Sequence, residues 1–251
     1  MPELNAQRRS KRVGHKGADH IAPGNTEASF AAALAHDVDM IEFDVLPERL
    51  DGSGELLLAH DYEDASRRTP LTLEKGLAHF EHDAYAAVEL DVDMKLPGYE
   101  ARVVDALRAH GLLARTLIST MEPSSLRVLR EIAPDVRVGW SFPRVRRDYT
   151  QHPVYRYPAY ALMLWYRRRL PKMAARALRE GRVDALMVHW AFVTARLHDA
   201  VTEAGGELYV WTVDDPRRIA DLERLGVAGI ITNDPRLFDA ARKPPSEEGP
   251  S

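Results

Sequence analysis

The chain has 251 residues, 45% of them hydrophobic, which is enough for one large domain or two small ones. Its 34 basic and 38 acidic residues give a net charge of −4, so no basic field points to nucleic acid as a partner. The absence of cysteine excludes disulfides and thiolate metal sites. The polar first residues do not resemble a signal peptide, and no apolar run approaches the roughly 20 residues of a membrane span. We therefore expect a cytoplasmic protein.

Short runs rich in Val, Ile and Leu alternate with amphipathic stretches along the chain, as expected for buried parallel strands joined by helices. The pattern predicts strands over residues 12–15, 40–46, 86–94, 116–119, 136–141, 185–189, 208–213 and 229–232. It predicts helices that begin near residues 25, 72, 99, 123, 158, 194, 216 and 235, several of them with Pro or a capping residue in the first turn. Eight strands and eight helices in this length indicate a (β/α)8 TIM barrel. A doubly wound open sheet is the alternative, but it needs no eighth unit.

No shift in composition marks a second domain. We expect residues 1–11 to be a disordered or extended N-terminus and residues 12–242 to be a single TIM-barrel catalytic domain. Residues 243–251, which read KPPSEEGPS, are expected to be a disordered tail because of their Pro, Ser and Glu content.

The stretch after strand two departs from simple alternation. Two turn pairs, Asp51-Gly52 and Ser53-Gly54, are followed by ELLLAHD, which reads as a short returning strand. We therefore predict a short β-arm after strand 2, with His60 close to its end.

Active sites of such barrels lie at the carboxyl ends of the strands, where polar residues interrupt the apolar runs of this chain. Glu42 and Asp44 lie two residues apart, so they project to the same side of the second strand. The polar residues of the third strand, VELDVDMK, likewise share one side. At these strand ends we note His15, Lys16, Glu42, Asp44, Asp91, Asp93 and Lys95, with His60 at the end of the arm.

Neighbouring carboxylates in an apolar strand repel one another and lose hydration, so a cation between them is expected. Glu42, Asp44 and Asp93 are candidate ligands of one hard divalent ion, Ca²⁺ or Mg²⁺. His15 and His60 are then candidate general acid and base, and Lys16 and Lys95 can neutralise an anion, for which phosphate is the natural choice. Taken singly, each residue has a plain structural explanation, as a solvated strand edge, a core histidine or a polar turn. Their coincidence at the strand ends favours function.

The same residues give the chain a resemblance to the glycerophosphodiester phosphodiesterases, which belong to the superfamily of phosphatidylinositol-phospholipase-C-like phosphodiesterases. The matching motifs run from about residue 12 to residue 235, in the family order and at similar spacing. They are His15-Lys16-Gly17, Pro23-Gly24-Asn25-Thr26, Ile41-Glu42-Phe43-Asp44-Val45, Asp51-Gly52, His60-Asp61, Asp93-Met94-Lys95, Trp211-Thr212 and Gly229-Ile230-Ile231-Thr232-Asn233-Asp234-Pro235.

The resemblance implies a (β/α)8 barrel that cleaves a phosphodiester into an alcohol and glycerol phosphate. It implies His15 and His60 as the acid–base pair and Lys16, Lys95 and Trp211 as contacts to the substrate. It also implies one Ca²⁺ or Mg²⁺ held by Glu42, Asp44 and Asp93. The expected partner is a small-molecule or lysolipid phosphodiester, and the expected setting is lipid metabolism.

Three positions depart from the family pattern. Lys16 stands in place of arginine and loses the bidentate contact to phosphate. Gly24 stands in place of a glutamate, whose role is then either missing or supplied by another residue, with Glu27 as a candidate. Asp93 is one methylene shorter than the usual glutamate, as in the related spider-toxin-like phospholipases D, and Asp91 competes with it for the role of ligand.

Two alternatives to the hydrolase therefore stay open. One is a phospholipase D-like lipid phosphodiesterase that forms a cyclic phosphate, which the aspartate ligand and the short arm favour. The other is a barrel that binds phosphate or a membrane without turnover, which Lys16 and Gly24 favour.

Residues 155–182 mix aromatic and aliphatic residues with the cluster Arg167-Arg168-Arg169. This composition is typical of a helix that lies on an anionic membrane as a peripheral contact. The alternative, which we favour at this point, is a barrel helix with its arginines in water. In either case Pro171 is expected to break or kink the helix.

Overall fold

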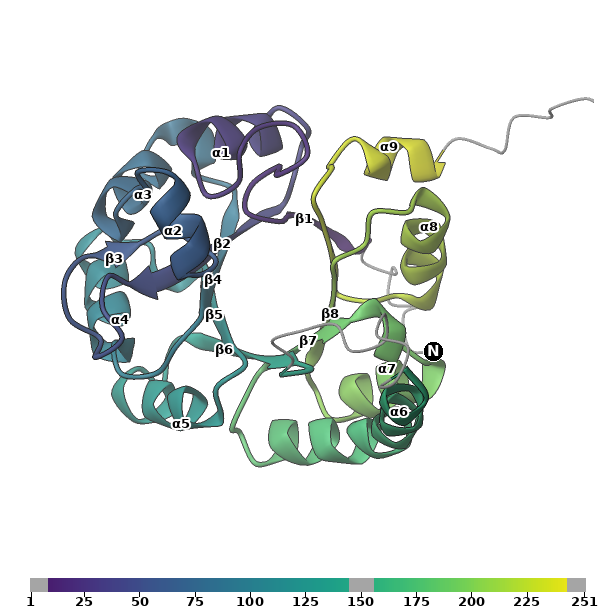
Figure 1. The fold of residues 1–251 in the computed structure, drawn as a ribbon. Coiled ribbons are helices and arrows are strands. Elements are labelled where there is room, and N and C mark those ends of the chain that lie inside the picture. Colours follow the sequence, from purple (N-terminus) through teal and green to yellow (C-terminus); the bar gives the residue numbers. More distant parts are fainter. Residues whose placement is uncertain (1–8, 145–155, 243–251) are drawn as a thin grey trace, which may run out of the picture.

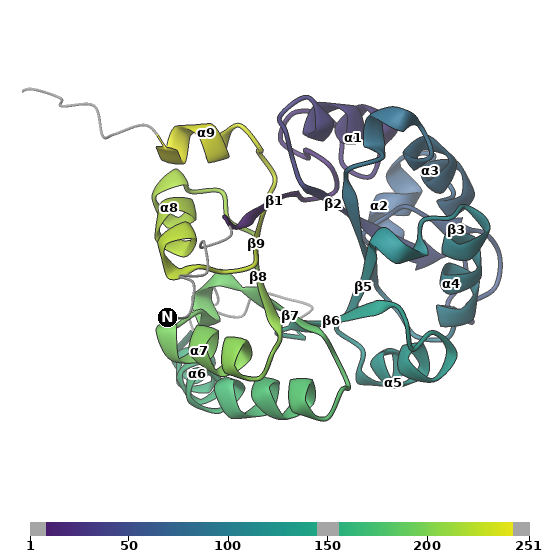
Figure 2. The same ribbon diagram turned by 180° about the vertical axis from the view of Figure 1, so that it is seen from behind.

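The computed structural model describes residues 9–144 and 156–242. The predicted tail and most of the predicted N-terminal segment lie outside the described residues. Eight parallel strands close into a barrel with helices around it, which confirms the predicted (β/α)8 fold (Figures 1 and 2). The barrel strands are β1 (Lys11–Gly14), β2 (Met40–Pro47), β4 (Glu89–Met94), β5 (Thr116–Thr120), β6 (Arg137–Phe142), β7 (Ala185–His189), β8 (Glu207–Trp211) and β9 (Gly229–Thr232), and β9 pairs with β1.

The helices lie outside the barrel and cover its strands (Figure 1). They are α1 (Glu27–Leu34), α2 (Tyr62–Arg67), α3 (Leu73–Phe80), α4 (Glu100–Ala109), α5 (Pro123–Ile132), α6 (Arg156–Arg179), α7 (Ala195–Glu203), α8 (Pro216–Leu225) and α9 (Leu237–Arg242). Local sequence explains where several of them begin. The side chains of Thr26, Thr72 and Thr194 accept hydrogen bonds from backbone N–H groups of the first turn, and α5 and α8 have proline in that turn.

Two predicted strands are shorter in the structure. The strand expected over 86–94 begins only at Glu89, because the N–H groups of Ala86 and Val88 donate to the carbonyls of Asp83 and Tyr85 in a 3₁₀ turn and not to the sheet. The strand expected over 208–213 ends at Trp211, and the residues after it turn toward α8. These differences leave the strand order unchanged.

The predicted β-arm is present. β3 (Leu56–Leu57) pairs antiparallel with the end of β2, with Leu46 opposite Leu57 and Pro47 opposite Leu56. The returning strand is shorter than the predicted ELLLAHD run, and the chain then enters α2, which the sequence did not predict. The arm and α2 lie on the side of the barrel where β2 ends (Figure 1).

The interior of the barrel is divided along its axis. Apolar side chains with almost no exposure pack in its lower part, namely Val13, Met40, Leu117, Ala185, Met187, Tyr209 and Ile231. Below them, at the amino end of the strands, Glu89 accepts hydrogen bonds from Lys11 and Arg137, which closes that end with ion pairs. The polar groups that line a cavity lie at the opposite end of the barrel, which we call the mouth.

Helix α6 is 24 residues long and includes Pro171, so the proline does not break it; a kink at this position stays a prediction. Proline has no backbone N–H, so one hydrogen bond of the helix is missing at this position, and the helix extends beyond it. Among the side chains of α6 that the structure describes, residues 162–179, Leu170 is the first that is fully buried, and Ala174 and Ala177 continue the same face. Within the described residues, none of the helices combines enough length and apolarity to cross a bilayer.

His110, at the end of α4, binds two carboxylates. Its Nε2 lies 2.9 Å from Glu74 of α3, and its Nδ1 lies 2.7 Å from Glu81. Burial by itself lowers the pKa of His110, but the two carboxylates outweigh burial and raise it. The ring therefore ties α3 to α4 most strongly when it is protonated.

We expect this contact to weaken as pH rises. The pKa of His110 in the folded protein lies above its unfolded value of about 6.5. The contact therefore stabilises the folded state fully below pH 6.5, and this stabilisation is lost as pH rises through the pKa of the folded state. The exposed carboxylates limit the effect to about 1 kcal/mol, or about 2–4 °C in Tm. Thermal unfolding of wild type and His110→Gln at pH 6 and pH 8.5 measures it. A difference in Tm that does not narrow at the higher pH would contradict the prediction.

Candidate active site

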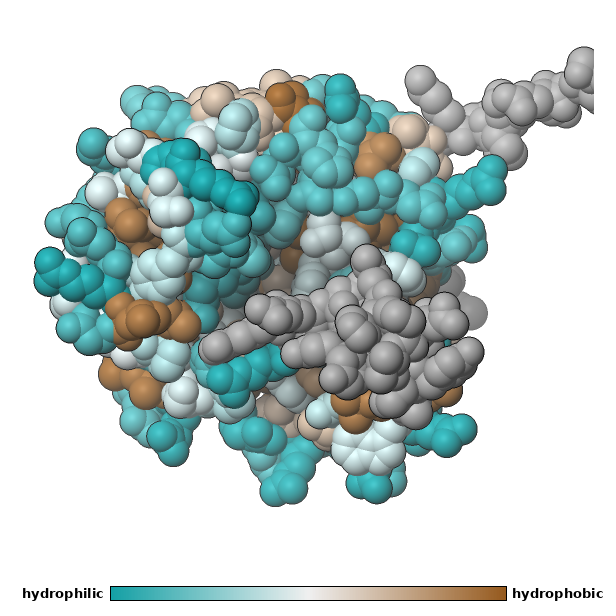
Figure 3. Space-filling view, in the orientation of Figure 1, coloured by the Kyte–Doolittle hydropathy of each residue, from teal (hydrophilic) through white to brown (hydrophobic). Residues whose placement is uncertain are grey.

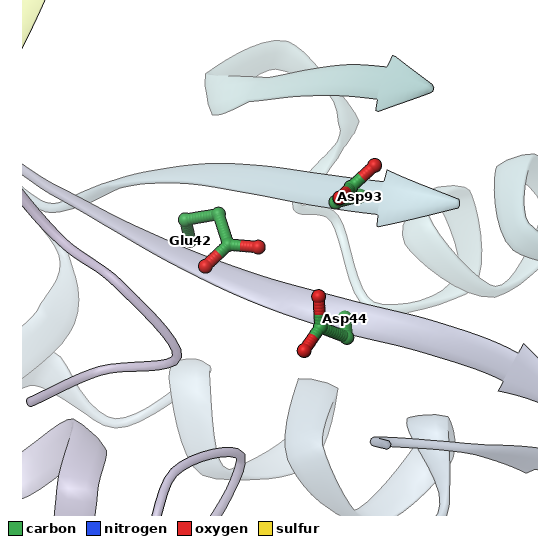
Figure 4. Close-up of side chains that lie close together, drawn as sticks. All are labelled: Glu42, Asp44 and Asp93. Atoms are coloured by element: carbon green, nitrogen blue, oxygen red, sulfur yellow. The ribbon is translucent and has the colours of Figure 1, made fainter. Parts of the chain in front are cut away.

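Three carboxylates from adjacent strands meet at the mouth of the barrel. Parallel pairing places Asp44 of β2 opposite Asp93 of β4, and Glu42 lies two residues before Asp44. One oxygen from each of the three lies within 4.8 Å of the others. Figure 4 shows Glu42 and Asp44 projecting from one strand toward Asp93 on its neighbour. The structure therefore brings together the three residues predicted as metal ligands.

The charges of this cluster are strongly coupled. Burial and the neighbouring charge of Asp44 raise the pKa of Glu42 well above its usual range. Burial would also raise the pKa of Asp44, but the ammonium groups of Lys95 and Lys16 lower it instead. Lys95 forms ion pairs with both Asp44 and Asp93. The cluster thus holds more negative charge than its one buried lysine neutralises.

The donor set fits a hard divalent cation. The Oδ1 atom of Asp93 is buried and has no hydrogen-bond partner among the described residues, and the same holds for Oδ1 of Asp91. A buried, unpaired carboxylate oxygen is costly, and a cation would remove that cost. All donors are carboxylate oxygens, the ligands that Ca²⁺ and Mg²⁺ prefer. Asp91 lies deeper than Asp93, opposite Glu42, and burial followed by the charge of Asp93 raises its pKa to about 7.

His15 follows β1 and is held by a chain of hydrogen bonds. Its Nδ1 lies 2.6 Å from Oδ1 of Asn233, and Nδ2 of Asn233 donates to Asp214 at 2.7 Å. Because the amide nitrogen is engaged by Asp214, the amide oxygen must accept from His15, so Nδ1 carries the proton. Nε2 then points toward Glu42, at 3.8 Å from its carboxylate. Burial lowers the pKa of His15, which keeps the ring neutral.

His60 lines the same cavity and is half-exposed. Its Nδ1 lies 3.0 Å from Oδ2 of Asp61, and the other oxygen of Asp61 accepts from the N–H of Asp64 in the first turn of α2. The unpredicted helix α2 therefore fixes the carboxylate that orients His60.

The cavity has a volume of about 170 Å³. It is lined by His15, Glu42, His60, Asp91, Asp93, Lys95, Ser119, Met121, Ser141, Met187, Trp211, Thr212 and Ile231. Both predicted acid–base histidines and two of the three predicted substrate contacts, Lys95 and Trp211, are among these residues. The Trp211 ring lies 5.2 Å from the ring of His189 and provides an aromatic wall.

Lys16 is placed differently from the other predicted contacts. Its side chain is not part of the cavity lining, and its ammonium lies 3.7 Å from Asp19. Its backbone N–H, however, donates to Glu42 at 2.8 Å. The positive φ of 50° at Lys16 orients this N–H toward the carboxylate. The direct contribution of Lys16 to the site is thus a backbone donor.

Asp19 also explains the glycine at position 24. The N–H of Gly24 donates to Oδ1 of Asp19 at 2.8 Å, and a Cβ at position 24 would lie only 2.5 Å from that oxygen. The carboxylate beside Lys16 is therefore supplied by Asp19. Glu27, the candidate substitute named from the sequence, is exposed at the start of α1, and its substitute role stays a prediction.

Three positioning residues had no predicted role: Asn25 and Asn233, which lie in quoted motifs, and Asp214, which lies outside them. Asn25 is buried, its amide nitrogen donates to Asp44 at 2.9 Å, and its amide oxygen accepts from the N–H of Asp44 at 3.0 Å. Its positive φ of 59° allows both bonds at once. The turn sequence before α1 was the available signal, since Asn is the residue other than glycine that best tolerates this backbone conformation.

Asn25→Gly tests this positioning role. Glycine keeps the positive φ but removes both hydrogen bonds to Asp44, so we expect a loss of about 10–100-fold in metal affinity or activity. Calcium or magnesium titration followed by isothermal calorimetry measures the affinity directly. Asn25→Asp, which keeps one acceptor, is the comparison, and equal affinity in Asn25→Gly and wild type would contradict the assignment.

Similarity to known proteins agrees with this geometry. A sequence profile of the glycerophosphoryl diester phosphodiesterase family matches residues 68–237. A glycerophosphodiester phosphodiesterase of Caldanaerobacter subterraneus subsp. tengcongensis is 27% identical over 92% of this chain and 97% of its own length. A crystal structure of a glycerophosphodiester phosphodiesterase from Agrobacterium tumefaciens has a TM-score of 0.68 at 20% identity, covering 93% of this chain and 99% of that one.

A phosphodiesterase of Oleispira antarctica, whose structure holds the product sn-glycerol-3-phosphate, has a TM-score of 0.69 at 17% identity. It covers 93% of this chain and 96% of its own. The closed barrel with an acidic cluster at its mouth defines the class, a barrel hydrolase with its site at the carboxyl ends of the strands. The chain belongs to the glycerophosphoryl diester phosphodiesterase family, and it is accordingly an enzyme that hydrolyses glycerophosphodiesters.

Proposed function

We propose that this enzyme is metal-dependent and cleaves its substrate by acid–base catalysis between His15 and His60. One observation carries the proposal: oxygens of Glu42, Asp44 and Asp93 lie within 4.8 Å of one another, and Glu42, Asp93 and both imidazoles line one cavity. We further propose that residues 12–242 form the catalytic domain.

His15 is suited to the role of general base. The hydrogen bond to Asn233 leaves its Nε2 as a proton acceptor that faces the carboxylate cluster. In the proposed reaction, the oxygen of a water attacks phosphorus while His15 takes a proton from that water at Nε2. Asn233 and Asp214 hold the ring in the required orientation throughout.

His60 is suited to the role of general acid. The carboxylate of Asp61 can hold the positive charge of a protonated ring, and the half-exposed position places His60 at the entrance. As the bond between phosphorus and the leaving oxygen breaks, His60 donates its proton to that oxygen. The products are a free alcohol and glycerol phosphate, and a proton transfer through water restores both histidines.

Glu42, Asp44 and Asp93 would hold one Ca²⁺ or Mg²⁺. Such an ion supplies Lewis-acid stabilisation of negative charge on phosphate oxygens. Lys95 lies between Asp44 and Asp93 and is proposed to bind the phosphate, and Trp211 is proposed to pack against the glycerol or alcohol part. The position of Lys16 beside Asp19 supports a weaker contribution of its side chain, by long-range charge.

The test is an assay with glycerophosphocholine, glycerophosphoethanolamine and a lysophospholipid, after chelation and after addition of Ca²⁺ or Mg²⁺. We expect activity that chelation abolishes and one of the two ions restores. Phosphorus NMR of the products separates hydrolysis, which gives a linear monoester, from an attack by a substrate hydroxyl, which gives a cyclic phosphate. Full activity in the chelated protein would overturn the metal assignment.

A further inference from the structure

The first half of helix α6 exposes an unusual combination of side chains. Leu162, Leu164 and Trp165 are 55%, 52% and 48% exposed, although large apolar side chains this exposed are few among the described residues. Met163 and Tyr166 of this part of α6 pack against the hydrophobic core, whereas Leu162, Leu164 and Trp165 are not among the residues that do so. This half of the helix, residues 162–169, therefore presents apolar surface that the described part of the fold does not cover.

The charge of α6 has a single sign. Its 24 residues include seven lysines and arginines and no aspartate or glutamate. Within the described ranges, no ion pair joins Arg168, Arg169 or Lys172 to an acidic side chain, whereas Arg176 near the end of the helix pairs with Glu180 at 2.6 Å. The cations beside the exposed apolar residues are thus available to an external anion.

Cations and apolar side chains share the same face. At 100° per residue, Arg168, Arg169 and Lys172 flank Trp165 on the side opposite Leu170 and Ala174. The guanidinium of Arg169 lies 5.3 Å from the centre of the Trp165 ring. Tryptophan surrounded by basic residues is the pattern of helices that lie at the boundary between lipid headgroups and acyl chains.

The placement of α6 brings this face to the side of the barrel that holds the active site. β6 ends at Phe142 at the mouth, and α6 then runs back toward the start of β7 at Ala185, so its first half lies nearer the mouth. The ring of Tyr166 packs on Phe142 at 5.1 Å, which fixes this part of the helix beside the end of β6. By contrast, Figure 3 shows a largely hydrophilic surface on the part of the mouth side formed by described residues.

We propose that the face formed by Leu162, Leu164, Trp165, Arg168, Arg169 and Lys172 docks on the surface of a membrane that contains anionic phospholipid. The occupant follows from the chemistry: cations that pair with no carboxylate of the described residues favour anionic headgroups, and the exposed tryptophan and leucines favour the apolar layer beneath them. A docked enzyme would have its cavity beside the lipid surface. The proposal concerns this surface alone and is independent of the reaction proposed above.

The test is sedimentation with vesicles of phosphatidylcholine alone and of phosphatidylcholine mixed with phosphatidylglycerol. We expect binding to the mixed vesicles that weakens as salt is raised. The triple variant Arg168→Gln, Arg169→Gln, Lys172→Gln should bind about 10²-fold more weakly, given about a fivefold contribution from each cation near the surface. The matched control Arg127→Gln, Arg217→Gln, Arg224→Gln removes the same charge from α5 and α8 and should bind nearly as wild type.

A second readout follows the apolar part of the surface. The fluorescence of Trp165, obtained as the difference between wild type and Trp165→Phe, should shift to the blue on mixed vesicles and become protected from iodide. Vesicle binding should not change when metal is removed by a chelator. Every α6 variant should keep wild-type turnover of a water-soluble glycerophosphodiester. Failure of the docking proposal and failure of the metal-dependent mechanism can therefore be told apart.

Three outcomes would overturn the docking proposal. The first is absence of binding to both kinds of vesicle. The second is equal loss of binding in the triple variant and its matched control, which would show an effect of net charge only. The third is self-association in light scattering that requires Trp165 without any vesicle binding, which would identify a second copy of the chain as the occupant.

Discussion

His15→Ala and His60→Ala are each expected to lower turnover of a glycerophosphodiester by about 10²–10⁴-fold, the usual contribution of a positioned acid or base. Neither ring is needed for the fold, because both line the cavity and their hydrogen bonds go to polar groups at its rim. Initial rates at saturating substrate, with Tm measured for each variant, check the prediction.

The two variants should also differ from each other. A substrate whose leaving group is p-nitrophenol needs little help from an acid, so it should largely rescue His60→Ala and leave His15→Ala impaired. His82→Ala, which removes an exposed imidazole on the outer surface, is the matched control and should keep full turnover. Equal rescue of both catalytic variants would contradict the assigned roles of base and acid.

Asp44→Asn is expected to abolish most metal-dependent activity, with a loss larger than the 10–100-fold typical of residues that only orient a ligand. Asparagine keeps the size of the side chain, but it removes a charge that lies at the centre of the cluster and pairs with Lys95. Calorimetric titration with Ca²⁺ and Mg²⁺ and a rate-against-metal curve provide the measurement.

We expect metal binding and activity to depend on where the negative charge is removed, and not on the change in net charge. Asp105→Asn on α4 removes a carboxylate that is 73% exposed at the surface and serves as the matched control. Because loss of one buried partner can destabilise the fold, Tm is compared as well. Tight binding of the ion by a folded Asp44→Asn variant would exclude Asp44 as a ligand.

The sequence predicted the barrel and most of the site for one physical reason. Carboxylates and histidines are rare within buried apolar strands, so Glu42, Asp44 and Asp93 stood out against their Val, Ile and Phe neighbours. Since parallel strands present their carboxyl ends to the same side, residues that were distant along the chain could be expected to meet. The parallel pairing of β2 with β4 then places Asp44 opposite Asp93.

Contacts made by loops could not be predicted in this way. The bond from Asn233 to His15 and the use of Asp19 beside Lys16 depend on loop paths that have no periodic pattern. Helix α2 was missed because its six residues include no buried side chain, so no apolar spacing marks it. Of the break or kink expected at Pro171, the break does not occur, and the buried residues Leu170 and Ala174 lie on either side of the proline within one helix.

The packed lower barrel limits how substrate enters the enzyme and how products leave it. Tyr209, Met187 and Met40 fill the channel, and the ion pairs around Glu89 close it from below, so nothing can pass from one end to the other. Substrate therefore enters, and both products leave, through the mouth of the barrel. Whichever fragment stays longer at the acidic cluster therefore blocks the next molecule, and inhibition by the retained fragment should be competitive with substrate.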